Sequence, residues 1–264
     1  MGKVKSMKQI GLFVHGGRED APAYAARAVK ALQNSGAEVW AEQNAASYLH
    51  VKELTQAEQL DALIALGGDG TLLRAAQEAV RTNAPLLGIN LGHMGFLTET
   101  EPDCLETAVK ALMEERYTLE NRMLLRIDRP HTGESYLALN DVVVNRGGYA
   151  RLITLDAFAG EEIVGHYVAD GLIVATPTGS TGYSLSAGGP VIHPAVDCVV
   201  ITPICAHSLQ HRPVVVQVDG QTRCMLRPGE DVLIARAEEE VRLVRLSPRR
   251  FFPLVREKLT EWSR

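Results

Sequence analysis

Leu66-Gly67-Gly68-Asp69-Gly70-Thr71 follows a short apolar run, Ala62 to Ala65, that has the length of a buried strand. The segment after it, Leu72 to Val80, is typical of a helix, so the glycines occupy a strand-to-helix turn. Glycine lets the backbone approach a ligand closely, and the free N–H groups at a helix N-terminus suit phosphate. The turn therefore predicts a phosphate site or, as the alternative, a tight turn in which Asp69 caps the helix.

A lone carboxylate in an anion site repels phosphate and needs a chemical role. If the turn binds phosphate, we expect Asp69 to bind a metal ion or to take a proton from a substrate hydroxyl group.

The composition is that of an ordinary globular protein of one large or two smaller domains: 264 residues, 46% hydrophobic and 22% charged. A net charge of -5 gives no reason to expect nucleic acid as a partner. The four cysteines lie far apart without a Cys-x-x-Cys pair, which predicts neither disulfides nor zinc and fits a reducing cytoplasm. No apolar run reaches about 18 residues, so we expect no membrane partner.

Strands and helices alternate in the first part of the chain. We expect strands at 9–15, 37–41, 62–65 and 85–90, and helices at 22–34, 72–80 and 102–115. Residues 42–58 fit neither pattern. This alternation predicts an α/β domain with a parallel sheet, in which ligands lie beyond the carboxyl ends of the strands.

Three loops follow predicted strands of this sheet, at Gly16-Gly17, at Gly67 to Gly70 and at Asn90 to His93. We expect them to line one edge, with His93 and Phe96 as candidate ligand contacts. The alternatives are that His93 only holds its loop and that Phe96 belongs to the core.

Short strands without long helices follow, which predicts an all-β, sandwich-like second domain. We place the domains at 1–118 and 119–245, followed by a helical tail at 246–264 that packs back on the first domain.

The stretch from Thr176 to Gly189 is rich in hydroxyl groups and glycines and follows the predicted strand 172–175. Such a loop suits the sugar, amide and phosphate parts of a nucleotide, and Tyr183 is placed to stack on a base. The alternative, a plain turn, is long and costly in backbone entropy. Asn140 and Asp141 are suited to an adenine edge and to ribose hydroxyls, although Asn-Asp is also a common turn sequence.

These segments together resemble the NAD kinase family. The resemblance rests on residues 67–70, 88–97, 140–141, 170–190 and 202–213, over nearly the whole chain after residue 60. The Gly-Gly-Asp-Gly turn alone is shared with lipid kinases and phosphofructokinases, whereas the stretch 176–189 is far more specific.

The resemblance implies a Rossmann-like α/β domain and a β-sandwich-like domain, with the site in the cleft between them and completed in a homodimer or homotetramer. It implies phosphoryl transfer from ATP, or from polyphosphate, to the 2′-hydroxyl of the adenosine ribose of NAD. Asp69 is then the general base on that hydroxyl. The implied binding positions are Gly67, Gly68, Gly70, Thr71, Phe96, Asn140, Asp141, Arg151, Val168, Asp170, Thr181, Gly182, Tyr183, Ser184, Leu185, Ser186 and Gln221.

The chain departs from the family pattern at four places. It has Asp141 where the family usually has Glu, Gly182 where Ala is usual, and Val168 where many relatives have Arg. The connection from 213 to 221 is also short, since the family usually has further strands there.

We expect no resident metal site, because no carboxylate cage is visible; Mg²⁺ would enter with ATP. Two alternatives to the NAD kinase hypothesis are a lipid kinase of the diacylglycerol type and a catalytically weak nucleotide-binding relative.

Overall fold

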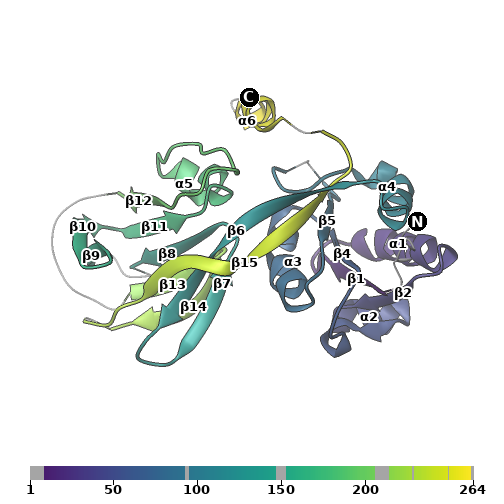
Figure 1. The fold of residues 1–264 in the computed structure, drawn as a ribbon, viewed down its shortest axis with the longest axis horizontal. Helices are drawn as coiled ribbons and strands as arrows, with labels where there is room; N and C mark the ends of the chain where they lie inside the picture. Colours follow the sequence, from purple (N-terminus) through teal and green to yellow (C-terminus); the bar gives the residue numbers. More distant parts are fainter. Residues whose placement is uncertain are drawn as a thin grey trace, which may run out of the picture. The chain divides into compact units, whose positions relative to one another are not determined.

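The structure is a computed structural model of the chain and describes residues 9–92, 95–146, 153–205, 214–227, 229–248 and 250–262. It divides into two units, one made of Met1–Asn121 with Val241–Arg264 and one of Arg122–Glu240 (Figure 1). The limits expected from the sequence were residues 118 and 245. The chain passes between the units within two strands, β6 (Thr118–Arg129) and β15 (Leu233–Arg245).

The first unit alternates strands and helices around a largely parallel sheet, whose strand order begins β3-β2-β1-β4-β5-β15. Its other elements are β1 (Gln9–Val14), α1 (Ala21–Asn34), β2 (Glu38–Ala41), α2 (Gln43–Leu49), β3 (Lys52–Glu53), η1 (Leu54–Gln56), β4 (Ala62–Leu66), α3 (Asp69–Arg81), β5 (Leu86–Ile89), η2 (Pro102–Cys104), α4 (Leu105–Met113) and α6 (Phe251–Trp262). Every residue of β4 and β5 is buried, as expected of parallel strands covered on both faces. The predicted α/β class is confirmed.

Residues 42–58, which the sequence left unassigned, form α2, β3 and η1. The helix is short, and only Ala45 and Ala46 of its residues are buried. It ends at His50 in a left-handed conformation with φ 54°. Two small buried residues do not make a periodic apolar pattern, so the helix could not be recognised in the sequence. Packing against neighbouring elements stabilises this segment more than its own helix propensity does.

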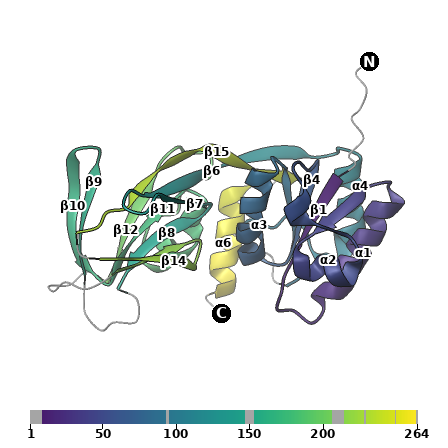
Figure 2. The ribbon, with the colours of Figure 1, turned by 90° about the horizontal axis from the view of Figure 1, so that it is seen from below.

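The second unit is built from antiparallel strands, as predicted. Its elements besides β6 and β15 are β7 (Glu134–Ala138), β8 (Asp141–Asn145), β9 (Ile153–Ala159), β10 (Glu162–Ala169), β11 (Gly171–Ala175), η3 (Gly179–Thr181), α5 (Tyr183–Ser186), β12 (Val200–Ile204), β13 (Val214–Val218) and β14 (Gln221–Leu226). Five strands form one sheet in the order β12-β11-β8-β13-β14. The β9–β10 pair forms a separate two-stranded arm of this unit (Figure 2).

The carboxyl ends of β1, β4 and β5 lie along one edge of the parallel sheet. The N–H of His15 donates to the carbonyl of Leu66 at 2.9 Å, and the N–H of Gly67 donates to the carbonyl of Ile89 at 3.0 Å. The loops after these three strands therefore leave the sheet at the same edge, as the sequence predicted. Among the helices that the structure describes, none combines the length and the hydropathy needed to cross a membrane.

Candidate functional site

The glycine turn places open space at the N-terminus of α3. Gly67 has φ +157°, and a Cβ there would lie 2.3 Å from Oγ1 of Thr71, so this position requires glycine. A Cβ at Gly68 or Gly70 would meet nothing within 4 Å. The first N–H groups of a helix have no partner within the helix and favour an anion. The turn can therefore receive a phosphate group against two glycines.

The carboxylate of Asp69 is fixed by the loop that follows β5. Its Oδ2 accepts the N–H of Phe96 at 2.8 Å, and its Oδ1 accepts those of Leu97 and Thr98 at 3.1 and 3.2 Å. A Cβ at Gly95 would lie 2.1 Å from Oδ1, so the loop can approach the carboxylate only because residue 95 is glycine. The alternative in which Asp69 caps the helix is wrong, since Gly68 holds the N-cap position and no side chain caps it.

The three N–H groups do not use the full hydrogen-bonding capacity of the Asp69 carboxylate. A carboxylate offers about four lone-pair positions. The described residues that donate to Asp69 occupy three of them, one on Oδ2 and two on Oδ1. The other position on Oδ2 has no donor among the described residues.

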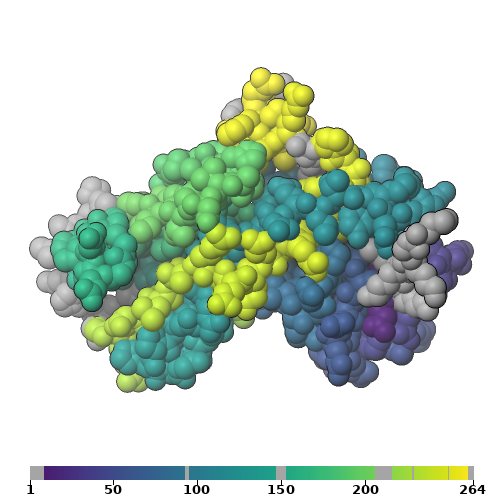
Figure 3. Space-filling view, viewed as in Figure 1, coloured from purple at the N-terminus to yellow at the C-terminus, as the bar shows by residue number. Residues whose placement is uncertain are grey.

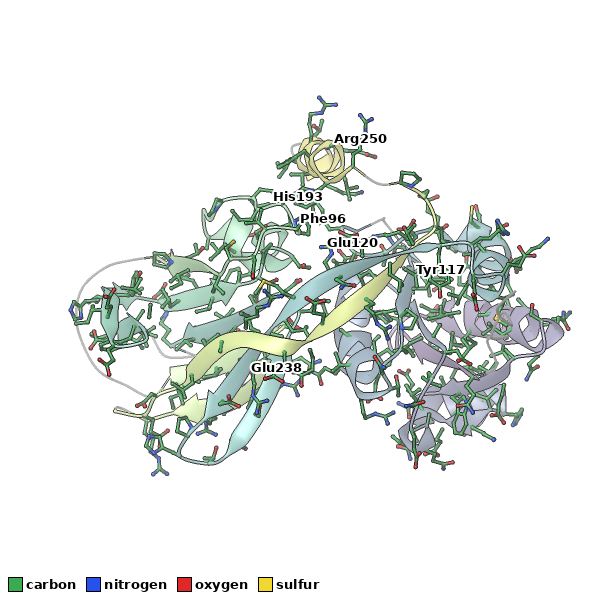
Figure 4. All side chains as sticks on the ribbon, in the orientation of Figure 1. Phe96, Tyr117, Glu120, His193, Glu238 and Arg250 are labelled. Carbon is green, nitrogen blue, oxygen red and sulfur yellow. The ribbon has the colours of Figure 1, made fainter. Side chains whose placement is uncertain are left out.

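The loop that holds Asp69 is itself anchored by a buried ion pair. Arg245 donates through Nη1 to the carbonyl of Leu97 and to Glu99 Oε2, both at 3.1 Å, and through Nε to Glu120 at 2.5 Å. Glu99 and Arg245 are nearly inaccessible, with side chains 1% and 8% exposed. Figure 4 labels Phe96 on this loop and Glu120 near the start of β6. The position of Asp69 therefore depends on residues distant in sequence.

In the second unit, the turn at Asn140 and Asp141 lies against the start of the loop 176–189. The N–H of Thr176 donates to the carbonyl of Asn140 at 2.9 Å, and a Cβ at Gly182 would lie 3.4 Å from Asn140 Nδ2. Asn140 Oδ1 is buried and has no hydrogen-bond partner among the residues that the structure describes. An unpartnered buried acceptor beside the glycine-containing loop 176–189 suits an amino group of a ligand.

Burial and a neighbouring carboxylate change the acidity of Asp141. They raise its pKa to about 7, burial being the larger cause and the charge of Asp219 the second. Burial also raises the pKa of Asp219, against the three backbone N–H groups that donate to it and the charge of Arg223. Near neutral pH Asp141 can therefore either donate or accept a hydrogen bond.

The loop expected to line a nucleotide pocket forms η3 and α5 and uses part of its hydroxyl groups internally. Ser184 is fully buried and bonds to Thr202 Oγ1 at 2.9 Å, and Thr181 donates to the carbonyl of Thr178 at 3.2 Å. Tyr183 is 46% exposed, so its ring is accessible for stacking. Leu185 is half-buried, and Ser186 is exposed.

The remaining predicted site residues are dispersed over the second unit. Asp170 accepts from Arg146 Nε at 2.8 Å. Val168 lies in β10, and Gln221 begins β14 after a two-residue turn. Arg151 and His93 lie outside the described residues.

Sequence reasoning missed three charged residues at these positions: Arg122, Arg146 and Asp219. Arg122 is buried and donates to Thr178 Oγ1 at 3.1 Å, at the start of the glycine-rich loop. The pairing of Asn145 with Gly171 brings Arg146 beside Asp170. Only the register of β8 against β11 shows that Arg146 and Asp170 are neighbours, and that register cannot be derived from the sequence of either strand alone. Within the described ranges, no group of three or more His, Cys, Asp or Glu residues is arranged to hold a metal ion.

Comparison with protein families agrees with this geometry. Residues 10–117 match the model of the ATP-NAD kinase N-terminal domain, and residues 139–218 match that of the ATP-NAD kinase C-terminal domain. The chain belongs to the NAD kinase family. An NAD kinase of Moorella thermoacetica is 45% identical over 76% of this chain and 71% of the relative. An NAD kinase of Symbiobacterium thermophilum is 41% identical over 87% of this chain and 90% of the relative.

Two solved structures of NAD kinase type share the fold. Yeast NADH kinase, complexed with NADH, superposes with a TM-score of 0.84 at 21% identity, over 97% of this chain and 88% of that one. An NAD kinase from Archaeoglobus fulgidus, in complex with ATP, gives 0.70 at 25% identity, over 96% and 98%. The chain is therefore an enzyme with NAD kinase activity, and nothing in the comparisons favours a lipid kinase.

Proposed function

We propose that this enzyme transfers a phosphoryl group from ATP, or from polyphosphate, to the 2′-hydroxyl of the adenosine ribose of NAD, giving NADP. The observation that carries the proposal is Asp69, a carboxylate fixed by three backbone amides beside a glycine turn with open space for phosphate. Phosphoryl transfer depends mainly on positioning and charge stabilisation, and an immobile base beside a phosphate site supplies the positioning.

Asp69 acts as the general base in this proposal. The free lone pair on Oδ2 accepts the proton of the ribose hydroxyl as its oxygen attacks the terminal phosphorus of the donor. The loop amides hold the carboxylate in orientation, and the free N–H groups at the start of α3 receive the donor phosphates beside Gly68 and Gly70. Thr71 Oγ1 adds a polar group next to the turn; it is buried, and no residue in the described part of the chain bonds to it.

The second unit supplies recognition of NAD. Asn140 binds the adenine edge through its unpartnered Oδ1, and Asp141 binds the ribose. Tyr183 stacks on the dinucleotide, and Asp170, oriented by Arg146, takes the nicotinamide carboxamide. The further proposed contacts, supported by the family resemblance, are Gly67, Phe96, Arg151, Val168, Thr181, Gly182, Ser184, Leu185, Ser186 and Gln221.

A divalent cation such as Mg²⁺ accompanies ATP in this proposal. Magnesium in kinase sites is commonly held by substrate phosphates with few protein ligands. Since no cluster of three candidate ligands occurs in the described part of the chain, the donor phosphates are the proposed carriers. When bound, the ion neutralises charge on the transferred group.

We also propose that the enzyme is a cytoplasmic homodimer or homotetramer. Phe158, Ile163 and Val164 of the β9–β10 arm are 57%, 55% and 49% exposed, which suits a surface covered by a second copy. Figure 3 shows this arm at the surface of the second unit. The four cysteines are unpaired, which is compatible with the proposed reducing compartment. Light scattering on the purified enzyme measures its mass in solution, and a monomer mass would contradict the proposed homodimer or homotetramer.

The experiment that tests the reaction is an NADP-formation assay with ATP and with polyphosphate as donors. We expect Asp69→Asn to keep NAD binding and to lose turnover by about 100-fold or more, because a base in reach contributes about 100- to 10,000-fold. Asp103→Asn, which removes an exposed carboxylate from the same unit, is the matched control. Normal turnover by Asp69→Asn would show that the base is a different residue.

A further inference from the structure

The turn Leu139-Asn140-Asp141 joins β7 to β8 and carries the residues proposed to recognise NAD. Such a turn must hold its side chains still if they are to select one ligand. Backbone N–H and C=O groups fix a turn when each has a partner, so the partners of these three residues identify what holds it. Any role of such a partner in recognition rests on the proposed function of Asn140 and Asp141.

All three N–H groups of the turn donate to one carboxylate. Asp219 Oδ2 accepts the N–H of Leu139 at 2.8 Å, and Oδ1 accepts those of Asn140 and Asp141 at 2.7 and 3.2 Å. Hydrogen bonds to an ionised acceptor are roughly twice as strong as neutral ones. A single side chain, about 80 positions later in the sequence, therefore orients the whole N–H face of the turn.

The three carbonyl groups have partners from two residues. Leu139 accepts from Thr176 Oγ1 at 2.7 Å, and Asn140 accepts from the N–H of Thr176 at 2.9 Å. Asp141 accepts from the N–H of Asp219 at 3.0 Å. Asp219 and Thr176 thus satisfy every backbone polar group of the turn, and the side chains of Asn140 and Asp141 are left for other partners.

A tight hairpin places Asp219 for this role. Val218 pairs with Gln221, so Asp219 and Gly220 alone form the connection between β13 and β14. Their φ angles are 47° and 75°, and two positive values in a two-residue hairpin turn favour Asp-Gly. The same turn geometry that closes the hairpin directs the carboxylate of Asp219 back to the neighbouring turn.

We propose that Asp219 is a positioning residue for NAD recognition: its carboxylate, together with Thr176, holds the Leu139–Asp141 turn so that Asn140 and Asp141 face the substrate. Asp219 does not touch the reacting atoms in this scheme. Its contribution is made through the orientation of Asn140 and Asp141, so losing it weakens NAD binding and not donor binding.

Asp219→Asn tests this role with little change in volume. The new amide group faces an N–H of the turn and repels it, because both are donors. We expect the KM for NAD to rise by about tenfold or more, which is the effect of losing a hydrogen bond to a charged group. The KM for ATP should stay within about twofold, because a loss confined to one substrate leaves the other unaffected. Amide hydrogen exchange at Leu139 to Asp141 should become faster.

Asp231→Asn is the matched control, since it removes an exposed carboxylate from the same unit. An unchanged KM for NAD in Asp219→Asn overturns the proposal, as does an equal rise in both KM values. If Asp219→Asn does not fold, Thr176→Val removes the hydroxyl that donates to Leu139 and is held to the same two criteria.

A failure of the proposed function is recognised separately. If the wild-type enzyme forms no NADP, the reaction assigned to the chain is wrong. The exchange rates of the three turn amides then decide the role of Asp219 without any assay of turnover. Unchanged rates in Asp219→Asn overturn that role, and faster rates support the proposal that Asp219 holds the turn.

Discussion

At the scale of single residues, one carboxylate has a structural task and, in our proposal, a chemical one. Asp69 closes the loop 95–98 by accepting three N–H groups, and we propose that its remaining lone pair accepts the substrate hydroxyl. Glycines permit this from two sides, because Gly95 lets the loop approach and Gly67 lets the chain turn above Thr71. Gly68 and Gly70 differ from them, since the space where a side chain would stand is open.

That open space gives a prediction for Gly70→Ala. Alanine is favoured over glycine in a helix by about 1 kcal/mol, and its Cβ would have no described heavy atom within 4 Å, so stability should be unchanged or improved. The KM for ATP should nevertheless rise by about tenfold, because the added methyl group displaces the donor phosphates from the turn. A displacement of the reacting groups by about 1 Å can lower a rate by up to about 100-fold. Thermal unfolding and initial rates measure the two effects.

Gln77→Ala, on the exposed face of the same helix, is the control and should change neither quantity. A wild-type KM for ATP in Gly70→Ala would mean that donor phosphates do not lie against this glycine.

At the scale of elements, strand register decides which polar residues meet. The pairing of Asn145 with Gly171 and of Asp141 with Ala175 is a single register of β8 against β11. It brings Arg146 beside Asp170 at one end and Asn140 beside Thr176 at the other. A shift by one residue would separate both pairs and turn each strand over.

A second link between elements joins Glu99 of the loop 95–99 to residues 245–247 at the end of β15, and we call it the strap. Glu99 Oε1 accepts the N–H groups of Leu246 and Ser247 at 2.9 and 3.2 Å, while Oε2 accepts from Arg245. Removing one partner from a buried ion pair leaves the other charge without full compensation. The strap therefore links the stability of the first unit to the loop that positions Asp69.

Arg245→Met should lower the free energy of unfolding by roughly 3–5 kcal/mol, the usual cost of breaking a buried pair from one side. Turnover should fall as well, because Leu97 loses the donor that holds its carbonyl. Chemical denaturation at neutral pH measures the first effect. The exposed Arg256→Met is the control, expected within about 0.5 kcal/mol of the wild type. A loss below about 1 kcal/mol in Arg245→Met would contradict the role given to the strap.

At the scale of the whole molecule, apolar periodicity was enough to predict the two structural classes and the helix Phe251–Trp262. The return of β15 to the parallel sheet was not predicted. It pairs Leu243 with Leu86, residues far apart in the chain, and no local pattern encodes such a contact. The glycine setting of Asp69 led to its prediction as the base, whereas Asp219 drew no prediction because Asp-Gly looks like an ordinary hairpin turn.

The facing carboxylates of Asp141 and Asp219 make the stability of the protein depend on pH. The pKa of Asp141 is about 7 in the folded state, against about 3.9 in an unfolded chain. Between these values the folded protein binds more protons than the unfolded one, so its free energy of unfolding falls as pH rises. The loss begins near pH 4 and is complete somewhat above pH 7. Burial also raises the pKa of Asp219, which adds a change of the same sign.

Asp141→Asn should remove most of this loss, because the amide has no proton to release and no longer repels Asp219. Between pH 4 and pH 7, we expect the free energy of unfolding of the variant to rise relative to that of the wild type. The difference reaches up to about 4 kcal/mol, at about 1.4 kcal/mol per pKa unit. Thermal unfolding measured across that range follows the difference. Asp231→Asn, an exposed aspartate of the same unit, should track the wild type. Parallel curves for the wild type and Asp141→Asn would show that Asp141 is ionised in the folded protein throughout, and that its burial is compensated by partners other than a bound proton.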